Sequence, residues 1–495
     1  MIDFSKFEDN LAQKTQVKSD STPTEALAFE EVIVSSDGTA SNARSMGRVN
    51  DMMAVLLTAI VLLAPLPLGS SRPVPWLILT AVMAILTIAH GLLSRRNAPG
   101  RSDPARQHLW LIIPGAVTLL AIVAQLLPIG YGAINGVAAD LAPDRLTLDA
   151  GATMIGALRF AGYGLFMILM IQVSENIIRV QRMMRWIYFG ILVHAIVGLI
   201  SFSFLGDRFL WGDKEYYLGY ATGTFVNRNS FATFLGFGVV LGFALLGEKL
   251  HAPRIRMPGG RKQWSATTLD IALLICTIML LVATLVATQS RMGLFATTVA
   301  AMFTLIAMDL KGGSHLLSTL AKASLLAVVC LIFLVLSGEG VIERALLSER
   351  DLSNRFDIYT ATWGMIKERP FFGWGFDSFP IAFELRHPEG LSASLVYDRA
   401  HSTYLAHWVE LGLIVGSLPI IVVAAAFAKS FQHLWRRKAG YTQAAAACGV
   451  ILLGAIHSTV DFSLEIAANV YLFIAIMALG VSHLRRRQSA GGKRP

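Results

Sequence analysis

The sequence has 495 residues, of which 54% are hydrophobic and 15% are charged, and its mean hydropathy is +0.57. A soluble domain carries about 25% charged residues, so this composition excludes an ordinary cytosolic enzyme, a disordered protein and a nucleic-acid-binding protein. The formal net charge of +9 therefore needs another explanation. Cys276, Cys330 and Cys448 all lie within apolar segments, and their spacing predicts neither a disulfide framework nor a zinc site.

The chain divides into a polar start, a long apolar body and a short basic end. Residues 1–50 lack the apolar run of a signal peptide, and we expect a disordered cytoplasmic tail there. A membrane-spanning helix takes roughly 20 predominantly apolar residues, and residues 51–484 contain twelve such stretches. We therefore predict an all-α polytopic membrane protein with about 12 transmembrane helices and a basic cytoplasmic tail at residues 485–495. The predicted spans are Met52–Leu68, Pro75–Leu93, Leu109–Leu127, Ala152–Val173, Ile187–Leu205, Phe231–Leu246, Leu269–Thr288, Gly293–Leu310, Thr319–Ser337, Ser402–Ala428, Thr442–Val460 and Ser463–Leu484.

The distribution of Lys and Arg predicts the orientation of these spans, because cytoplasmic loops carry the positive excess. One set of connections holds 22 cations. They lie within residues 95–106, 179–185, 249–262, 311, 429–438 and 485–494. The short loops of the opposite set hold six, which are Arg72, Arg145, Arg208, Lys214, Arg228 and Arg291. Both termini are therefore expected in the cytoplasm, and the net charge is mostly a topology signal.

The large external loop, residues 338–400, is too long for a simple turn and should contain structure. Asn354–Glu368 has the pattern of an amphipathic helix that lies along the membrane surface. The face of this helix is formed by Phe356, Tyr359, Trp363 and Ile366. Trp363 and the aromatic residues of the following turn, Phe371, Phe372, Trp374 and Phe376, are expected at the level of the lipid headgroups. Gly373 and Gly375 permit a tight turn between these aromatic residues.

Three external side chains are candidates for chemistry. Arg228 lies between Asn227 and Asn229 where a helix re-enters the membrane, and Arg291 lies in a very short turn. A guanidinium at either place favours an anionic partner, although snorkelling to lipid headgroups explains each one separately. His401 follows the large external loop on the same membrane face, where it could accept a proton or merely cap the next helix.

Several motifs in this order resemble the O-antigen ligase and polymerase superfamily of bacterial membrane glycosyltransferases, from about Val180 to His483. The motifs are Gly223-Thr224-Phe225 with Asn227-Arg228-Asn229, Ser290-Arg291, Arg355 to Trp363 leading into Arg369-Pro370-Phe371-Phe372-Gly373-Trp374-Gly375, and Ala400-His401-Ser402-x-Tyr404-Leu405 with Glu410-Leu411-Gly412. One position departs from the pattern, because Val415 stands where the family usually has glycine and Gly416 follows.

The resemblance implies transfer of a glycan from an undecaprenyl-pyrophosphate carrier at the periplasmic face of the bacterial inner membrane, with two arginines and a histidine in the reaction. Those roles fall on Arg228, Arg291 and His401. The resemblance and the neighbouring positions also suggest Asn227, Asn229, Arg355 and Tyr404 as contacts to the pyrophosphate or glycan, and Glu410, His457 and Asp461 as supporting residues.

The chemistry of these side chains is compatible with such a reaction. Arginine binds phosphate oxygens bidentately and stays charged, and histidine is suited to accept the proton of an attacking hydroxyl near neutral pH. Direct attack inverts the anomeric configuration. The external loops contain no Asp-x-Asp pair, and we expect no metal and no other cofactor.

Two alternatives are also compatible with the sequence. A multispan transporter or flippase of lipid-linked sugars agrees with the number of spans, but Arg159 and Lys322 are the clear charges within them and the two halves show no similarity. Within the enzyme class, the acceptor is the lipid A core for a ligase, a second carrier-linked glycan for a polymerase, or a protein. Membrane lipids are further expected partners and nucleic acid is not.

The predicted topology is tested by cysteine labelling in a background without the three native cysteines. We expect a cysteine at Gly390 to react with an impermeant external reagent and one at Gly259 to react only after the membrane is permeabilised. The reverse pattern would contradict the orientation, because it would place His401 and both arginines in the cytoplasm.

Overall fold

The structure is a computed structural model that describes residues 45–97, 103–130, 144–251 without 211, 266–314, 341–388 and 396–484, together with residues 391–392 and isolated positions between 317 and 328. The chain forms two compact units. The smaller unit comprises residues 1–53 and 88–102, and its described parts, 45–53 and 88–97, are helical. Within it, Nε2 of His90 and Oδ1 of Asn50 form a buried hydrogen bond of 2.9 Å.

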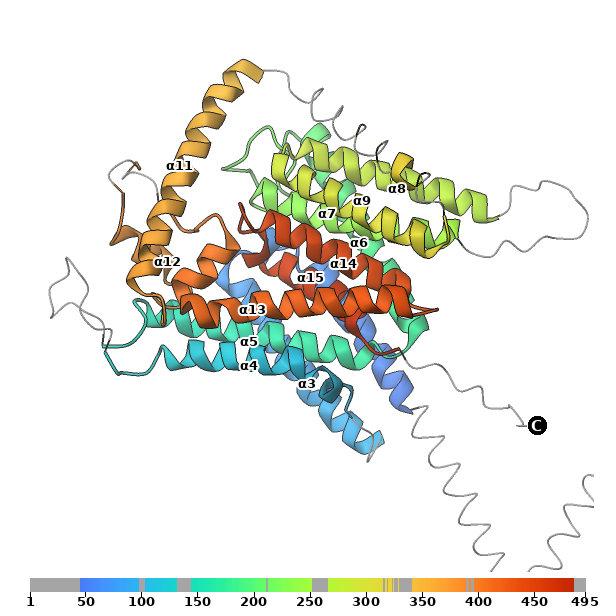
Figure 1. Cartoon of the computed structure of the whole chain (residues 1–495), viewed down its shortest axis with the longest axis horizontal. Helices are drawn as coiled ribbons and strands as arrows, with labels where there is room; N and C mark the ends of the chain where they lie inside the picture. The colour runs from blue at the N-terminus through green and yellow to red at the C-terminus, as the bar shows by residue number, and fades with distance from the viewer. Residues whose placement is uncertain are drawn as a thin grey trace, which may run out of the picture. The chain divides into compact units, whose positions relative to one another are not determined.

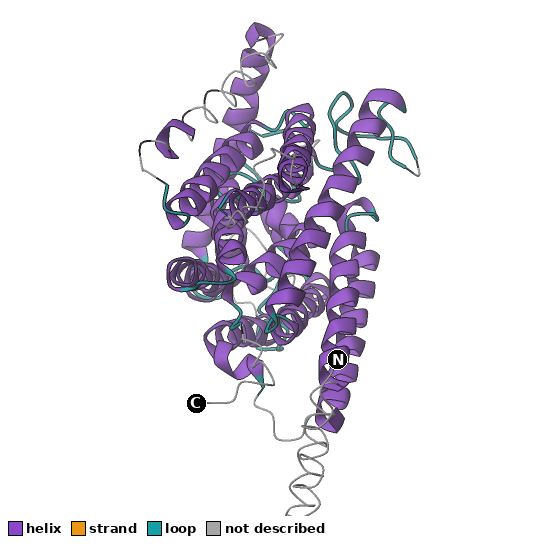
Figure 2. Ribbon diagram, turned by 90° about the vertical axis from the view of Figure 1, so that its right-hand side faces the viewer, coloured by secondary structure: helices purple, strands orange, loops and turns teal. Residues whose placement is uncertain are grey.

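The larger unit, residues 54–87 and 103–495, is a helical bundle, and Figure 2 shows helices without any strand in the described parts of the chain. Nine described helices, beginning with Ser45–Leu63, are long and apolar enough to cross a membrane. The protein is thus an all-helical, polytopic membrane protein. The labelled helices are α3 (Pro73–Asn97), α4 (Leu109–Ala124), α5 (Ala150–Val173), α6 (Ile177–Phe204), α7 (Arg228–Leu250), α8 (Ala266–Ala287), α9 (Arg291–Lys311), α11 (Val341–Glu368), α12 (Phe379–Glu384), α13 (Thr403–Arg436), α14 (Tyr441–His457) and α15 (Ala467–Val481).

Most of the predicted spans correspond to these helices. The shorter helices α14 and α15 account for the last two predicted spans, while Thr319–Ser337 lies mainly outside the described residues. The first apolar helix already includes Ser45, ahead of the predicted Met52, and α6 begins at Ile177 rather than at Ile187. Polar residues at a helix end continue the backbone hydrogen-bonding pattern beyond the apolar run, which is why hydropathy predicted late starts.

Helix α7 is the buried centre of the larger unit, with 83% of its apolar window inside the protein. Its glycines permit close packing of the surrounding helices, as small residues do in membrane bundles. A Cβ atom at Gly236 would clash with Oγ1 of Thr297 on α9, and one at Gly242 would lie 2.6 Å from Cγ1 of Ile278 on α8. This packing holds the N-terminal ends of α7 and α9 at the same end of the bundle.

Helix α13 is broken at Gly412, whose φ of 75° and ψ of 168° are not helical. The break frees the carbonyls of Val409 and Glu410, which accept hydrogen bonds from the backbone amides of Trp374 (2.8 Å) and Gly375 (3.1 Å). The freed amide of Leu413 in turn donates to the carbonyl of Pro370 (2.7 Å). The segment 370–376 therefore completes the backbone hydrogen bonding of the broken helix.

Gln125, just after α4, joins the two sides of this break. Its Nε2 amide donates to the carbonyls of Phe372 (2.8 Å) and Glu410 (2.9 Å), and its Oε1 accepts from the amide of Phe376 (3.0 Å). The positive φ values of Gly373 (65°) and Gly375 (108°) confirm the predicted tight turn. One glutamine thus connects α4, α13 and the turn.

Helix α11 crosses one end of the bundle in Figure 1 and extends further towards the N-terminus than the predicted Asn354–Glu368. Phe356 is 71% exposed and Trp363 is 42% exposed, so these two predicted surface aromatic residues do not pack into the protein core. The face that packs on the protein is formed by Ile358, Met365 and Ile366, which contact residues of α12 and α13. Phe371 and Phe372 are exposed, whereas Trp374 and Phe376 belong to the core.

The break in α13 predicts that Gly412→Ala and Gly364→Ala differ strongly in their effect on the stability of the protein. At Gly412 the backbone conformation disfavours an L side chain, which costs roughly 1–3 kcal/mol, and a Cβ atom would clash with the carbonyl oxygen of Phe371. Gly364 lies within α11, where a Cβ atom would meet no other atom within 4 Å, so Ala there should stabilise the helix by about 0.5–1 kcal/mol. Thermal unfolding of the purified protein measures both, and equal stability of the two variants would contradict this account of the break.

Candidate functional site

Arg228 is held at the first position of α7 by its local sequence. The side chain of Asn227 caps the helix by accepting from the amides of Asn229 (2.7 Å) and Ser230 (3.4 Å). The guanidinium carbon of Arg228 lies 4.1 Å from the ring centroid of Tyr220 and 6.0 Å from that of Tyr217. Arg228 forms no ion pair with a described residue, so its charge is balanced by aromatic rings rather than by a carboxylate.

The loop before α7 is ordered by Lys214, which sequence analysis treated as one more external cation. Its ammonium group pairs with Asp207 and donates to the carbonyls of Tyr217 (3.3 Å) and Tyr220 (2.7 Å). Nδ2 of Asn227 also donates to the hydroxyl of Tyr217 (3.1 Å). Lys214 and Asn227 thereby fix the two rings that face Arg228.

Asp461 is the buried carboxylate of this region, between α14 and α15. It accepts hydrogen bonds from Nδ2 of Asn229 (2.8 Å) and from the hydroxyl of Ser463. Its carbonyl accepts from Oγ1 of Thr403 at 3.3 Å. Asp461 therefore ties the start of α7 to the start of α13.

Arg355 on α11 reaches the same region, where Nη1 donates to the carbonyl of Val460 at 3.3 Å. Tyr217 lies near Arg355 and near two other charged groups of this region, Arg228 and Asp461. Burial and the neighbouring Asp461 raise the pKa of the Tyr217 hydroxyl, while Arg228 and Arg355 act to lower it. Both arginines and Asp461 thus lie close enough to one tyrosine to affect its ionisation.

His401 sits beside these groups in an uncommon backbone conformation, with φ of 52°. Its carbonyl accepts a hydrogen bond from the hydroxyl of Tyr359 on α11 (3.0 Å), and its ring lies 5.4 Å from that of Phe462. The amide of Thr403 donates to the carbonyl of Ser458 (3.1 Å), which anchors the chain on the other side. Left-handed residues other than glycine cost about 1–3 kcal/mol and gather at functional sites, so this strain marks His401 as a positioned side chain.

We call His401, Arg228, Arg355, Asp461 and Tyr217 the His401 cluster. Arg291 lies at the same end of the bundle, since it begins α9 and the neighbouring Gly293 packs against Ala232 on α7. The side chain of Arg291 is exposed. The structure therefore places Arg228 and Arg355 near Tyr217, places the His401 ring against Phe462 next to Asp461, and leaves the side chain of Arg291 exposed at the same end of the bundle.

The other predicted residues fall into two groups. Nδ1 of His457 lies 2.6 Å from Oγ1 of Thr233, which donates to the carbonyl of Asn229, so His457 supports the start of α7. Tyr404 instead donates to the carbonyl of Ala455 (2.9 Å), and both Tyr404 and Glu410 line an apolar cavity deeper in the bundle. Tyr404 and Glu410 thus face this cavity.

Sequence reasoning missed Tyr217 and Tyr220, and it placed Tyr359 only among the aromatic residues of the membrane surface. The available signal for the first two was the aromatic run of residues 216–220 in a polar loop shortly before Arg228. In the described part of the chain, no group of three or more His, Cys, Asp and Glu side chains is arranged to hold a metal ion. The metal-free mechanism stays a prediction.

The fold and this cluster together define a polytopic membrane protein with arginine and histidine side chains gathered at one end of its bundle. Residues 276–420 match the family described as O-antigen ligase. That stretch includes Arg291, Arg355 and His401, and the match confirms the resemblance seen in the sequence. It supports a membrane glycosyltransferase of the O-antigen ligase or polymerase type in broad terms. No curated protein shows a significant match to the chain.

Asp461 should be important for the stability of this end of the bundle. Asp461→Ala leaves the partly buried amide of Asn229 and the buried hydroxyl of Ser463 without their acceptor, and an unsatisfied buried group costs roughly 1–3 kcal/mol. Asp398→Ala is the matched control, because Asp398 is exposed and such changes stay within about 0.5 kcal/mol. Thermal unfolding in detergent measures both, and equal melting temperatures would contradict the linking role of Asp461.

Proposed function

We propose that this protein is an inner-membrane glycosyltransferase that passes a glycan from an undecaprenyl-pyrophosphate carrier to an acceptor hydroxyl at the periplasmic face. The observation that carries the proposal is the His401 cluster, where Arg228 and Arg355 lie around Tyr217 without forming an ion pair to a described carboxylate. Two arginines without a carboxylate partner attract an anionic group. The match of residues 276–420 to the O-antigen ligase family supports the same class of reaction.

The arginines suit the leaving group of this reaction. Breaking the bond between the anomeric carbon and the pyrophosphate leaves negative charge on phosphate oxygens, which a planar guanidinium can bind bidentately. Arg228 and Arg355 belong to the His401 cluster, while Arg291 lies exposed at the same end, where it can reach the outer part of the donor. Positive charge fixed before the reaction stabilises the transition state without reorganisation.

His401 is the proposed general base. The acceptor hydroxyl loses a proton as its oxygen attacks the anomeric carbon, and a neutral imidazole can take that proton. The new bond forms as the pyrophosphate leaves, so the configuration at the anomeric carbon inverts. The hydrogen bond from Tyr359 to the carbonyl of His401 (3.0 Å) supports the orientation of this histidine, and we expect the reaction to proceed without a divalent metal.

The test compares donor binding and glycan transfer for His401→Ala, Arg228→Lys and Arg355→Lys in reconstituted protein. His401→Ala should lower transfer by roughly 10²- to 10⁴-fold, the usual contribution of a general base, while binding of the lipid-linked oligosaccharide stays close to wild type. The Arg→Lys variants should weaken both donor binding and transfer, because lysine keeps the charge but loses the bidentate fork.

His251→Ala is the matched histidine control, since His251 follows the opposite end of α7, and it should transfer normally. A chelator should leave wild-type transfer unchanged. Near-normal transfer by His401→Ala would contradict the role of His401 as general base. Chelator-sensitive transfer would contradict the metal-free mechanism. Offering the lipid A core, a second carrier-linked glycan and a protein acceptor in separate reactions distinguishes ligase, polymerase and protein glycosyltransferase.

A further inference from the structure

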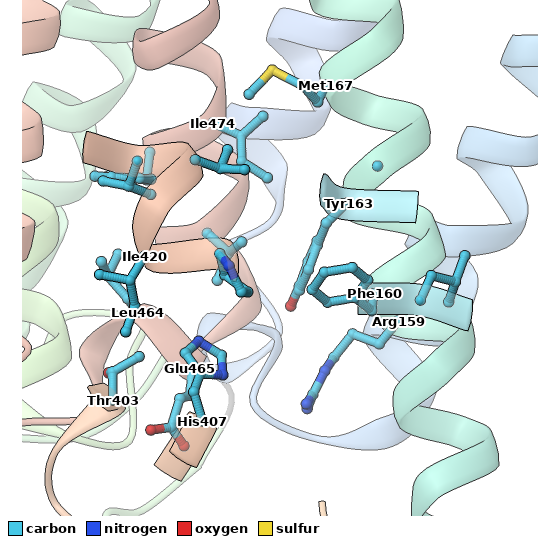
Figure 3. Close-up of a pocket in the computed structure, with 18 of the residues that line it drawn as sticks. Arg159, Phe160, Tyr163, Met167, Thr403, His407, Ile420, Leu464, Glu465 and Ile474 are labelled. Atoms are coloured by element: carbon cyan, nitrogen blue, oxygen red, sulfur yellow. The ribbon is translucent and has the colours of Figure 1, made fainter. Parts of the chain in front are cut away.

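A cavity of about 490 Å³ lies between α4, α5, α13, α14 and α15, within the larger unit. Its volume falls within the range of roughly 300–1,000 Å³ that is usual for small-molecule sites. Most of its wall is aliphatic and aromatic, with Met167 and Phe160 from α5, Ile420 from α13 and Ile474 from α15 among the lining residues (Figure 3). A wall of this kind accommodates a hydrocarbon chain.

One end of the cavity is polar, and the two arginines closest to it are each paired with a carboxylate. Nη2 of Arg159 donates to both carboxylate oxygens of Asp377, at 2.7 and 2.9 Å. Nη1 of Arg399 pairs with Oε2 of Glu465 at 2.9 Å. Because both arginines already bind a carboxylate, this end offers no excess positive charge to a phosphate, in contrast to the His401 cluster.

Two polar atoms at this end of the cavity can form a hydrogen bond with a ligand. The hydroxyl of Tyr163 and Oε1 of Glu465 are buried and make no hydrogen bond with any residue that the structure describes. Both residues line the cavity. Figure 3 shows Arg159 and Tyr163 on one wall and His407 and Glu465 on the facing wall, with the polar ends directed into the space between them. Buried polar atoms left without a partner are destabilising, so these two favour a polar ligand group.

We propose that this cavity binds a lipid whose hydrocarbon chain carries an uncharged hydroxyl group, such as an isoprenoid alcohol or an acylglycerol. The hydroxyl donates a hydrogen bond to Oε1 of Glu465 and accepts one from the hydroxyl of Tyr163, and the chain lies against the apolar wall. A phosphate there would face the carboxylates of Asp377 and Glu465. This inference does not rest on the proposed glycosyl transfer, because it concerns residues outside the His401 cluster and is tested by binding alone.

The experiment uses the full-length protein in nanodiscs and three photoreactive probes, which are a long-chain alkanol, an isoprenoid alcohol and the phosphate ester of the alkanol. Labelled peptides are identified by mass spectrometry. We expect the alcohols to label peptides from α5 and α15, and the phosphate ester to label them roughly tenfold less, the change that corresponds to about one hydrogen bond to a charged group. The better of the two alcohols identifies the source of the ligand, isoprenoid or acyl.

Three variants test the assignment of the cavity. Tyr163→Phe and Glu465→Gln should each reduce labelling by the alcohols, whereas Tyr188→Phe should not, because the Tyr188 hydroxyl already binds Oγ1 of Thr277 (2.8 Å) away from the cavity. Gly164→Leu should block labelling, since Gly164 lines the cavity and a Cβ there meets no atom within 4 Å. Gly364→Leu is its control outside the cavity.

Thermal unfolding of each variant shows that it is folded before labelling is compared. Equal labelling by the phosphate ester would overturn the inference of an uncharged ligand. Undiminished labelling of Gly164→Leu, or of both Tyr163→Phe and Glu465→Gln, would overturn the assignment of the site. Because no step requires glycan transfer, a failure here is distinct from a failure of the proposed enzyme activity.

Discussion

In a bilayer, each backbone amide and carbonyl has to find its hydrogen-bond partner within the protein, and this requirement governs the region around the break in α13. The break at Gly412 frees the carbonyls of Val409 and Glu410, which are satisfied by the turn at residues 373–375 and by Gln125. The turn therefore cannot move independently of α13. Since α11 packs on α13 and carries Arg355 and Tyr359, the same hydrogen bonds help to position side chains around His401.

The fold also places four arginines in two different environments. Arg159 and Arg399 are each neutralised by a carboxylate at the end of the cavity. Arg228, by contrast, stacks on tyrosine rings, and Arg355 donates to a backbone carbonyl. A buried charge is stable only when it is paired or hydrogen-bonded, so Arg159 can lie among the packed helices. Arg228 and Arg355 lie at the end of the bundle, where an anion can approach.

Thr403 lies at the boundary between these two environments. Its hydroxyl donates to the carbonyl of Asp461, next to the His401 cluster, and the residue also lines the cavity. A lipid held in the cavity would therefore lie next to the proposed site of glycan transfer. The broken helix, the cluster and the cavity are arranged along the first turns of α13, and this arrangement gives the region its proposed chemistry.

The sequence alone determined the helical class of this protein and the positions of most of its apolar helices, because a run of apolar residues reflects the local requirement to bury a span in lipid. It also singled out Arg228 and His401, whose motifs are local. The tertiary structure alone revealed the pairing of Arg159 with Asp377 and the three hydrogen bonds of Gln125. Packing likewise decided that Trp374 is buried while Phe372 is exposed, and that Tyr404 and Glu410 face the cavity. These contacts join residues far apart in the chain, and hydropathy and spacing carry no information about which distant side chains meet when helices pack.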